Sequence, residues 1–137
     1  MNLLRPASSS HAEVVNGPRP ARVLVCDDSA VVRAAIVRIL ETDPQIHVAA
    51  RAANGQQAID EVVRQRKLGT PIDVAVLDIE MPVMDGMAAL PALLRADPAL
   101  RVIMASTLTT RGADIALRAL RLGAADYVPK PHCRYRR

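Results

Sequence analysis

The stretch Val23-Leu-Val-Cys-Asp27-Asp28-Ser29 decides the fold that this sequence predicts. Four apolar residues in a row are typical of a short strand that is buried on both faces of a parallel sheet. Two carboxylates follow the run, and Ser29 is a suitable N-cap for a helix whose apolar side chains recur at helical spacing until Asp43-Pro44. The stretch therefore predicts a strand, a polar turn and a helix in succession.

This strand and helix unit repeats along the chain. Further strands are expected at residues 46–52, 73–77, 101–105 and 125–128, and further helices between Asn54-Gly55 and Gly69, at 85–96 and at 110–122. Regular alternation with short links predicts an α/β domain, in which helices cover both faces of a five-stranded parallel sheet. In such a sheet, ligands bind beyond the carboxyl ends of the strands, near the point where the strand order reverses.

The composition fits one domain with an aliphatic core. The chain has 137 residues, of which 50% are hydrophobic, with no Phe or Trp and two Tyr. This length is enough to bury a core. Residues 1–21 are rich in turn-forming residues and are expected to form a flexible arm, residues 22–131 the domain, and residues 132–137 a short basic tail.

Charge and cysteine usage exclude several classes of protein. The net charge of +4 comes from the two ends, since residues 1–21 contribute +1 and residues 132–137 contribute +3, which leaves residues 22–131 neutral. A folded basic face for nucleic acid is therefore not expected. Cys26 and Cys133 lack metal-ligand spacing and are expected to be free thiols in a reducing compartment. With no signal-peptide core and no membrane-spanning run, a cytoplasmic protein is predicted.

Three carboxylates and one lysine fall at predicted strand ends. Asp27 and Asp28 end the first apolar run, Asp78 ends the third, and Lys130 follows the fifth. Crowded carboxylates repel one another, so their convergence at one rim of the sheet makes sense if a cation lies between them. Mg²⁺ suits such oxygen ligands, with Asp28 and Asp78 binding it directly and Asp27 holding one of its waters.

The same residues suggest phosphoryl chemistry. A carboxylate such as Asp78 can act as a nucleophile that forms an acyl phosphate, and Lys130 can bind a phosphoryl oxygen as a point charge. Ser106 or Thr107, after the fourth strand, can donate a hydroxyl hydrogen bond to the same group. Each residue alone has an ordinary explanation: an N-terminal helix charge for Asp27-Asp28, turn formation for Asp78 and for Asp85-Gly86, a surface lysine for Lys130, and loop hydroxyls for Ser106 and Thr107.

Four segments together resemble the receiver domain of two-component response regulators: Val-Leu-Val-Cys-Asp27-Asp28-Ser29, Leu-Asp78-Ile-Glu80-Met-Pro-Val-Met-Asp85-Gly86, the hydroxyl of Ser106, and Tyr127-Val-Pro-Lys130-Pro131. The resemblance spans roughly residues 22–131 and implies a flavodoxin-like fold with strand order 2-1-3-4-5. Met104-Ala-Ser-Thr and Leu122-Gly-Ala-Ala-Asp-Tyr are most similar to the regulatory domain of the chemotaxis protein-glutamate methylesterase.

The resemblance implies a role for each site residue. Asp78 is the phosphoacceptor, and Asp27 and Asp28 hold Mg²⁺ together with Asp78 and the backbone carbonyl of Glu80. Ser106 and Lys130 bind the phosphoryl group, and Tyr127 is the aromatic side chain that rotates on activation. The implied phosphoryl donor is a sensor histidine kinase.

The sequence departs from the resemblance after Pro131. Receivers continue with a further helix that covers the face shared with the first helix, whereas here six polar residues follow. An exposed apolar patch on that face is therefore expected, open to an output partner or to dimerisation. A methylesterase domain is also expected to be absent, so the chain itself is not expected to be an enzyme. The alternatives are an interaction module that no longer switches and a Mg²⁺-dependent phosphohydrolase with an aspartyl nucleophile.

Overall fold

The computed structural model describes residues 19–107 and 112–131. The strands are β1 Ala21–Cys26, β2 Ile46–Ala52, β3 Val74–Asp78, β4 Arg101–Ser106 and β5 Asp126–Pro129, and the helices are α2 Ala30–Leu40, α3 Gly55–Lys67, α4 Gly86–Ala96 and α5 Gly112–Arg121. All strand pairs are parallel, in the order β2-β1-β3-β4-β5. The predicted α/β fold and its strand order are thus confirmed.

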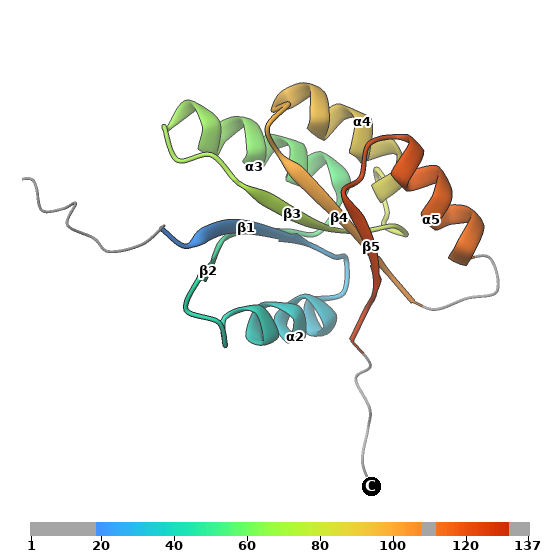
Figure 1. Ribbon diagram of the computed structural model, residues 1–137, viewed down its shortest axis with the longest axis horizontal. Helices are drawn as coiled ribbons and strands as arrows, with labels where there is room; N and C mark the ends of the chain where they lie inside the picture. Colours follow the sequence, from blue (N-terminus) through green and yellow to red (C-terminus); the bar gives the residue numbers. More distant parts are fainter. Residues whose placement is uncertain (1–18, 108–111, 132–137) are drawn as a thin grey trace, which may run out of the picture.

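The helices form two unequal layers. α2 lies alone on one face of the sheet, and α3, α4 and α5 lie on the other (Figure 1). Val23 and Val25 of β1 pack against Ile36 and Val37 of α2, whereas Leu24 points to the opposite face and joins the larger core. Because β1 is buried on both faces, its side chains are apolar in succession instead of alternating with polar ones.

Side-chain caps mark the start of α2, α3 and α4, and the cap of α2 by Ser29 is the one that the sequence predicts. The side chains of Ser29, Asn54 and Asp85 each accept a hydrogen bond from the backbone N–H three residues later in the chain. The donors are Val32, Gln57 and Ala88, at 3.2, 2.9 and 2.8 Å. The first strand begins at Ala21, two residues before the apolar run at Val23, and the Ala21 N–H donates to the Gln45 carbonyl at 2.8 Å. The predicted start of the last helix at Thr110, residues 1–18 of the arm and the tail with Cys133 lie outside the described residues.

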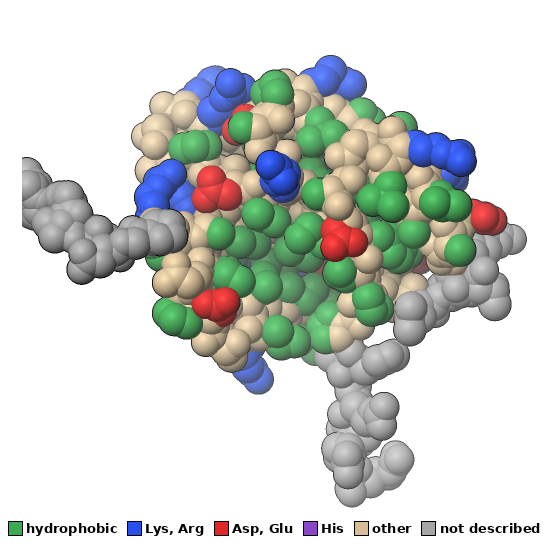
Figure 2. Space-filling model, in the orientation of Figure 1, with side chains coloured by type: hydrophobic (Ala, Val, Ile, Leu, Met, Phe, Trp, Pro, Cys, Tyr) green, Lys and Arg blue, Asp and Glu red, His purple; other side chains and the backbone are tan. Residues whose placement is uncertain are grey.

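An apolar groove lies on the face that α2 covers only in part. It has a volume of about 240 Å³ and is lined by side chains from α2, the central strands and the end of β5, namely Ile36, Ile39, Leu40, Val76, Ile103, Ala105, Val128, Pro129 and Pro131. Figure 2 shows hydrophobic side chains gathered between α2 and β5. The expected apolar patch is therefore present.

None of the helices within residues 19–107 and 112–131 has the length and apolar character that a membrane-spanning segment needs.

The loop between β3 and α4 holds a strained residue. Val83 has a φ of 71° and is 83% exposed. A β-branched residue is rare in this left-handed region, where the side chain crowds the backbone.

We expect Val83→Asn to raise the free energy of unfolding by about 1 kcal/mol, measured by urea denaturation. Val31→Asn, at an exposed helical valine, is the control and should not stabilise the chain; an equal or lower stability of Val83→Asn would contradict the strain.

Candidate metal-binding site at the carboxyl ends of the strands

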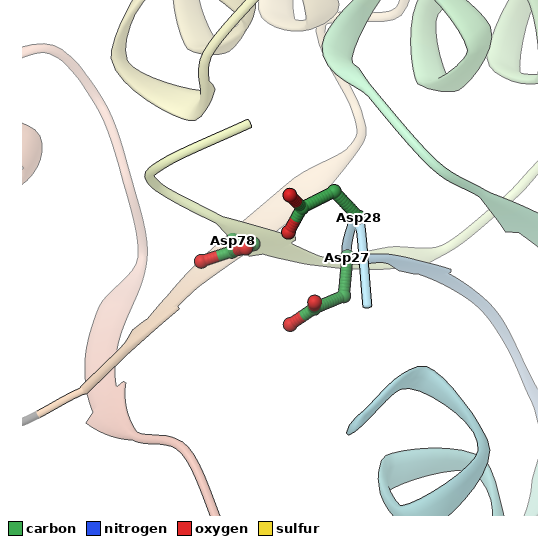
Figure 3. A group of neighbouring side chains, drawn as sticks. All are labelled: Asp27, Asp28 and Asp78. Carbon is green, nitrogen blue, oxygen red and sulfur yellow. The ribbon is translucent and has the colours of Figure 1, made fainter. Parts of the chain in front are cut away.

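Three carboxylates converge where β1 and β3 end. Asp27 and Asp28 follow β1, Asp78 is the last residue of β3, and their side chains point into one space (Figure 3). One oxygen from each lies within 4.8 Å of the others. Asp27 and Asp78 are buried and Asp28 is exposed, so the cluster reaches from the interior to solvent. The predicted convergence of the strand-end carboxylates is present in the structure.

Lys130 completes the cluster from the end of β5. Its Nζ lies 3.0 Å from Asp27 Oδ2 and 3.0 Å from Asp78 Oδ1, with only 14% of the side chain exposed. The backbone N–H of Lys130 donates to the Ser106 carbonyl at 2.8 Å, which holds the Lys130 backbone beside β4. Apart from the ion pair with Lys130, the buried Asp27 Oδ2 has no hydrogen-bond partner in the described part of the chain.

The charges of the cluster do not balance. Burial raises the pKa of Asp78, the hydrogen bond from Lys130 opposes this rise, and the charge of Asp27 adds to it. Burial lowers the pKa of Lys130, but the two carboxylates outweigh that effect, so its pKa is raised and it stays protonated. One ammonium group faces three carboxylates, and a hard divalent cation with oxygen ligands is the group that would offset the excess. The donor set, and an Asp27 oxygen with no other partner, therefore fit Mg²⁺.

The loop after β3 folds back closely on Asp78. The N–H of Gly86 donates to the Ile79 carbonyl at 2.7 Å, and the N–H of Gly55 donates to the Met84 carbonyl at 2.9 Å. A Cβ on Gly86 would lie 2.1 Å from the Asp78 carbonyl oxygen. Glu80 is exposed within this loop, two residues after Asp78. The path of the loop thus depends on Gly86, a constraint beyond the ordinary turn formation that the dipeptide suggests.

Ser106 and Tyr127 make no described hydrogen bond to the cluster. β4 pairs Ala105 with Asp78, so the half-buried Ser106 is one residue beyond that pair, and Thr107 is exposed. Tyr127 is half-buried against the larger core. Among the described residues, no side-chain hydrogen bond joins Ser106 or Tyr127 to the carboxylates. Their predicted roles therefore remain predictions, whereas the contact of Lys130 with Asp27 and Asp78 is direct.

The thiol of Cys26 lies next to the carboxylates. Burial first, and then the charges of Asp78 and Asp27, raises its pKa to about 12. Its Sγ donates to the Asn54 carbonyl at 3.2 Å and lies 3.5 Å from Met81 Sδ. The thiol is therefore protonated and a poor nucleophile near neutral pH. It is a free cysteine, as predicted, and it packs instead of reacting.

Sequence reasoning missed Arg33, which donates from Nη1 to the Asp27 carbonyl at 2.6 Å. The prediction of α2 rested on its apolar side chains alone. An arginine one turn into a helix that follows two aspartates was the available signal, because its long side chain can reach back to the preceding loop.

Comparison with known protein families matches residues 23–135 to the response regulator receiver domain. The chain belongs to this receiver family. It is 64% identical over 115 residues to a protein-glutamate methylesterase/protein-glutamine glutaminase of *Rhodospirillum centenum*, a match that covers 84% of this chain. This receiver spans only 28% of the length of that relative.

Solved structures agree with the assignment. The receiver resembles the response regulator domain of *Thermotoga maritima* CheB, with a TM-score of 0.73 and 39% identity over 83% of this chain and 81% of that one. It also resembles a chain in the complex of the CheA3 P1 domain with CheY6 from *R. sphaeroides*, with a TM-score of 0.70 and 38% identity over 85% and 86% of the two chains. The chain is thus a receiver domain of the chemotaxis CheB type.

Proposed function

We propose that this receiver takes a phosphoryl group onto Asp78 from the phosphohistidine of a sensor histidine kinase. The contact of Lys130 with both Asp27 and Asp78, within a cluster of three carboxylates, is the observation that carries the proposal. An Asp78 carboxylate oxygen attacks phosphorus, the nitrogen–phosphorus bond breaks, and its electron pair returns to the imidazole of the donor. The product on Asp78 is an acyl phosphate.

Asp28, Asp78 and the Glu80 carbonyl would hold Mg²⁺, and Asp27 would hold one of its waters. When bound, the ion supplies positive charge that offsets the charge of the phosphoryl oxygens. Lys130 is placed to bind a phosphoryl oxygen, since its Nζ already contacts Asp78 Oδ1 at 3.0 Å. The other site residues of the chain thus bind and orient the group while Asp78 forms the bond.

The conformational switch follows from the added charge. A phosphoryl group brings about −1.5 to −2 charges, which would draw the Ser106 hydroxyl and Lys130 toward it. Ser106 ends β4 and Lys130 follows β5, so their movement would pull these neighbouring strand ends together. Tyr127, half-buried on β5, is the side chain that we propose changes position with them.

The proposed partners are a histidine kinase and an output partner. The kinase is supported by the similarity to a chain from a complex with a CheA3 P1 domain. The output is proposed to be a methylesterase domain, as in the *R. centenum* relative, or a second receiver on the apolar groove. We propose that the domain spans residues 22–131 and acts in the cytoplasm, without nucleic acid or membrane as partner and without enzymatic turnover of its own.

Incubation of the chain with acetyl phosphate and Mg²⁺ tests the proposal, with intact mass as the measurement. We expect a gain of one phosphoryl group that is lost when EDTA removes the metal, because the uncompensated carboxylates would repel the donor. No gain in a sample shown to be folded would favour the interaction module that no longer switches. Rapid multiple turnover of a phosphorylated substrate would favour the aspartyl phosphohydrolase.

A further inference from the structure

Arg33 ties the first helix to the acidic cluster. It lies in α2 and is half-buried, and its Nη1 donates to the backbone carbonyl of Asp27 at 2.6 Å. Asp27 itself is fully buried. A charged donor makes a stronger hydrogen bond than a neutral one, and a buried carbonyl that loses its partner carries the cost of having left water. The contact is therefore worth more than a surface arginine usually contributes.

The rest of Asp27 is held by other groups. Its N–H donates to the Ala52 carbonyl at 3.0 Å, and its Oδ1 accepts from the Ser29 N–H at 2.9 Å. Lys130 contacts the remaining carboxylate oxygen. The carbonyl is the point at which the chain turns toward Asp28, and in the described part of the chain Arg33 supplies its side-chain partner. Arg33 thus contacts the turn at its backbone carbonyl.

Arg33 has a neighbour that carries the same charge. The other side of Arg33 borders an open cleft of about 320 Å³, whose lining includes Arg51 and Gln57. Arg51 is therefore a matched neighbour: it has the same charge and lines the same cleft, but it has no hydrogen bond to Asp27 among the described residues. A comparison of the two arginines can separate the hydrogen bond from charge alone.

We propose that Arg33 is a positioning residue: through the Asp27 carbonyl it holds the turn that carries Asp27 and Asp28 in the arrangement that binds Mg²⁺. The inference rests on the proposed function of the cluster. It assigns to α2 a direct part in setting metal affinity, and hence the rate of phosphorylation of Asp78.

Mg²⁺ titration by calorimetry tests this role in Arg33→Met, Arg33→Lys and Arg51→Met. We expect Arg33→Met to raise the Kd for Mg²⁺ about tenfold, the change that corresponds to about 1.4 kcal/mol. Arg33→Lys keeps the charge and a donor and should recover part of the affinity. Arg51→Met should change the Kd less than about twofold, since it removes only a more exposed charge.

Two results would overturn the inference. One is an equal increase of the Kd in Arg33→Met and Arg51→Met, which would assign the effect to charge alone. The other is a lower melting temperature of Arg33→Met with an unchanged Kd, which would assign Arg33 a purely structural role. If the unmodified chain binds no Mg²⁺, the proposed function fails instead, and amide exchange decides about Arg33. The Ser29 amide should then exchange about tenfold faster in Arg33→Met than in Arg51→Met, as loss of about 1.4 kcal/mol of protection requires, and equal rates would refute the positioning role.

Discussion

Asp78→Asn should abolish the phosphoryl gain with acetyl phosphate and Mg²⁺ while leaving the chain folded. The amide is nearly the same size as the carboxylate but is too weak a nucleophile to form the acyl phosphate. We expect labelling to fall at least about a hundredfold, since Asp27, which contacts Lys130 at the same distance, also accepts a hydrogen bond from the Ser29 N–H and is proposed to hold a metal water. Intact mass, followed by peptide mapping, measures both the extent of labelling and its position.

Asp28→Asn is the matched control for Asp78→Asn. It removes a carboxylate of the same cluster, but an exposed one. Labelling should become slower and need more Mg²⁺, without being abolished, because a metal ligand is weakened while the nucleophile remains. Full labelling of Asp78→Asn would contradict the assignment of the phosphoacceptor, and would direct attention to Asp27 or Asp28.

Asp78→Asn also has a predicted effect on stability, and this effect depends on pH. The pKa of Asp78 is raised above 3.8 in the folded chain, chiefly by burial. The folded state therefore binds this proton more tightly than the unfolded state, and the stability so gained is complete below the unfolded pKa and lost as pH rises through the folded pKa. Asn does not titrate, so Asp78→Asn does not lose this stability as pH rises. The free energy of unfolding of Asp78→Asn minus that of the unmodified chain should therefore be larger at pH 7 than at pH 4, in urea denaturation without metal. An equal difference at both pH values would contradict the raised pKa.

The strands and the cluster of four charged groups could be predicted because both depend on local pattern. A strand buried on both faces leaves a continuous apolar run, as in Val23-Leu-Val-Cys. Parallel strands bring their carboxyl ends to one edge, so Asp27, Asp78 and Lys130 could be placed together before any distance was known. The strand ranges agree with the predicted ones to within two residues.

The remaining features depend on contacts that sequence pattern does not encode. Arg33 contacts the Asp27 carbonyl through a polar side chain, and the apolar periodicity that predicts this helix does not report such a contact. Val83 adopts a positive φ although valine disfavours it, so the residue type predicts the opposite of what the loop contains. The side-chain positions of Ser106 and Tyr127 relative to Asp78 are likewise set by tertiary packing, so sequence resemblance names their roles without placing them.

Gly86→Ala should strongly destabilise the fold, although alanine normally favours a helix. Gly86 is the first residue of α4, where alanine would by propensity alone stabilise the helix by up to about 1 kcal/mol. A Cβ there would lie 2.1 Å from the Asp78 carbonyl oxygen and 3.0 Å from Ile79 Cα. Both neighbours are backbone atoms that cannot rotate away, so we expect the free energy of unfolding to fall by about 3 kcal/mol in urea denaturation.

Gly69→Ala separates this steric effect from the general cost of replacing glycine. Gly69 has a φ of 80° but no atom within 4 Å of the added Cβ, so its replacement should cost only about 1 kcal/mol of backbone strain. If Gly86→Ala is no less stable than Gly69→Ala, the close approach of α4 to Asp78 is wrong. If the difference is as expected, the clash falls on the carbonyl of Asp78 itself, and the folded fraction of Gly86→Ala should also be labelled more slowly by acetyl phosphate. Gly86 would then have two roles: it begins α4, and its lack of a side chain keeps the Asp78 backbone in place.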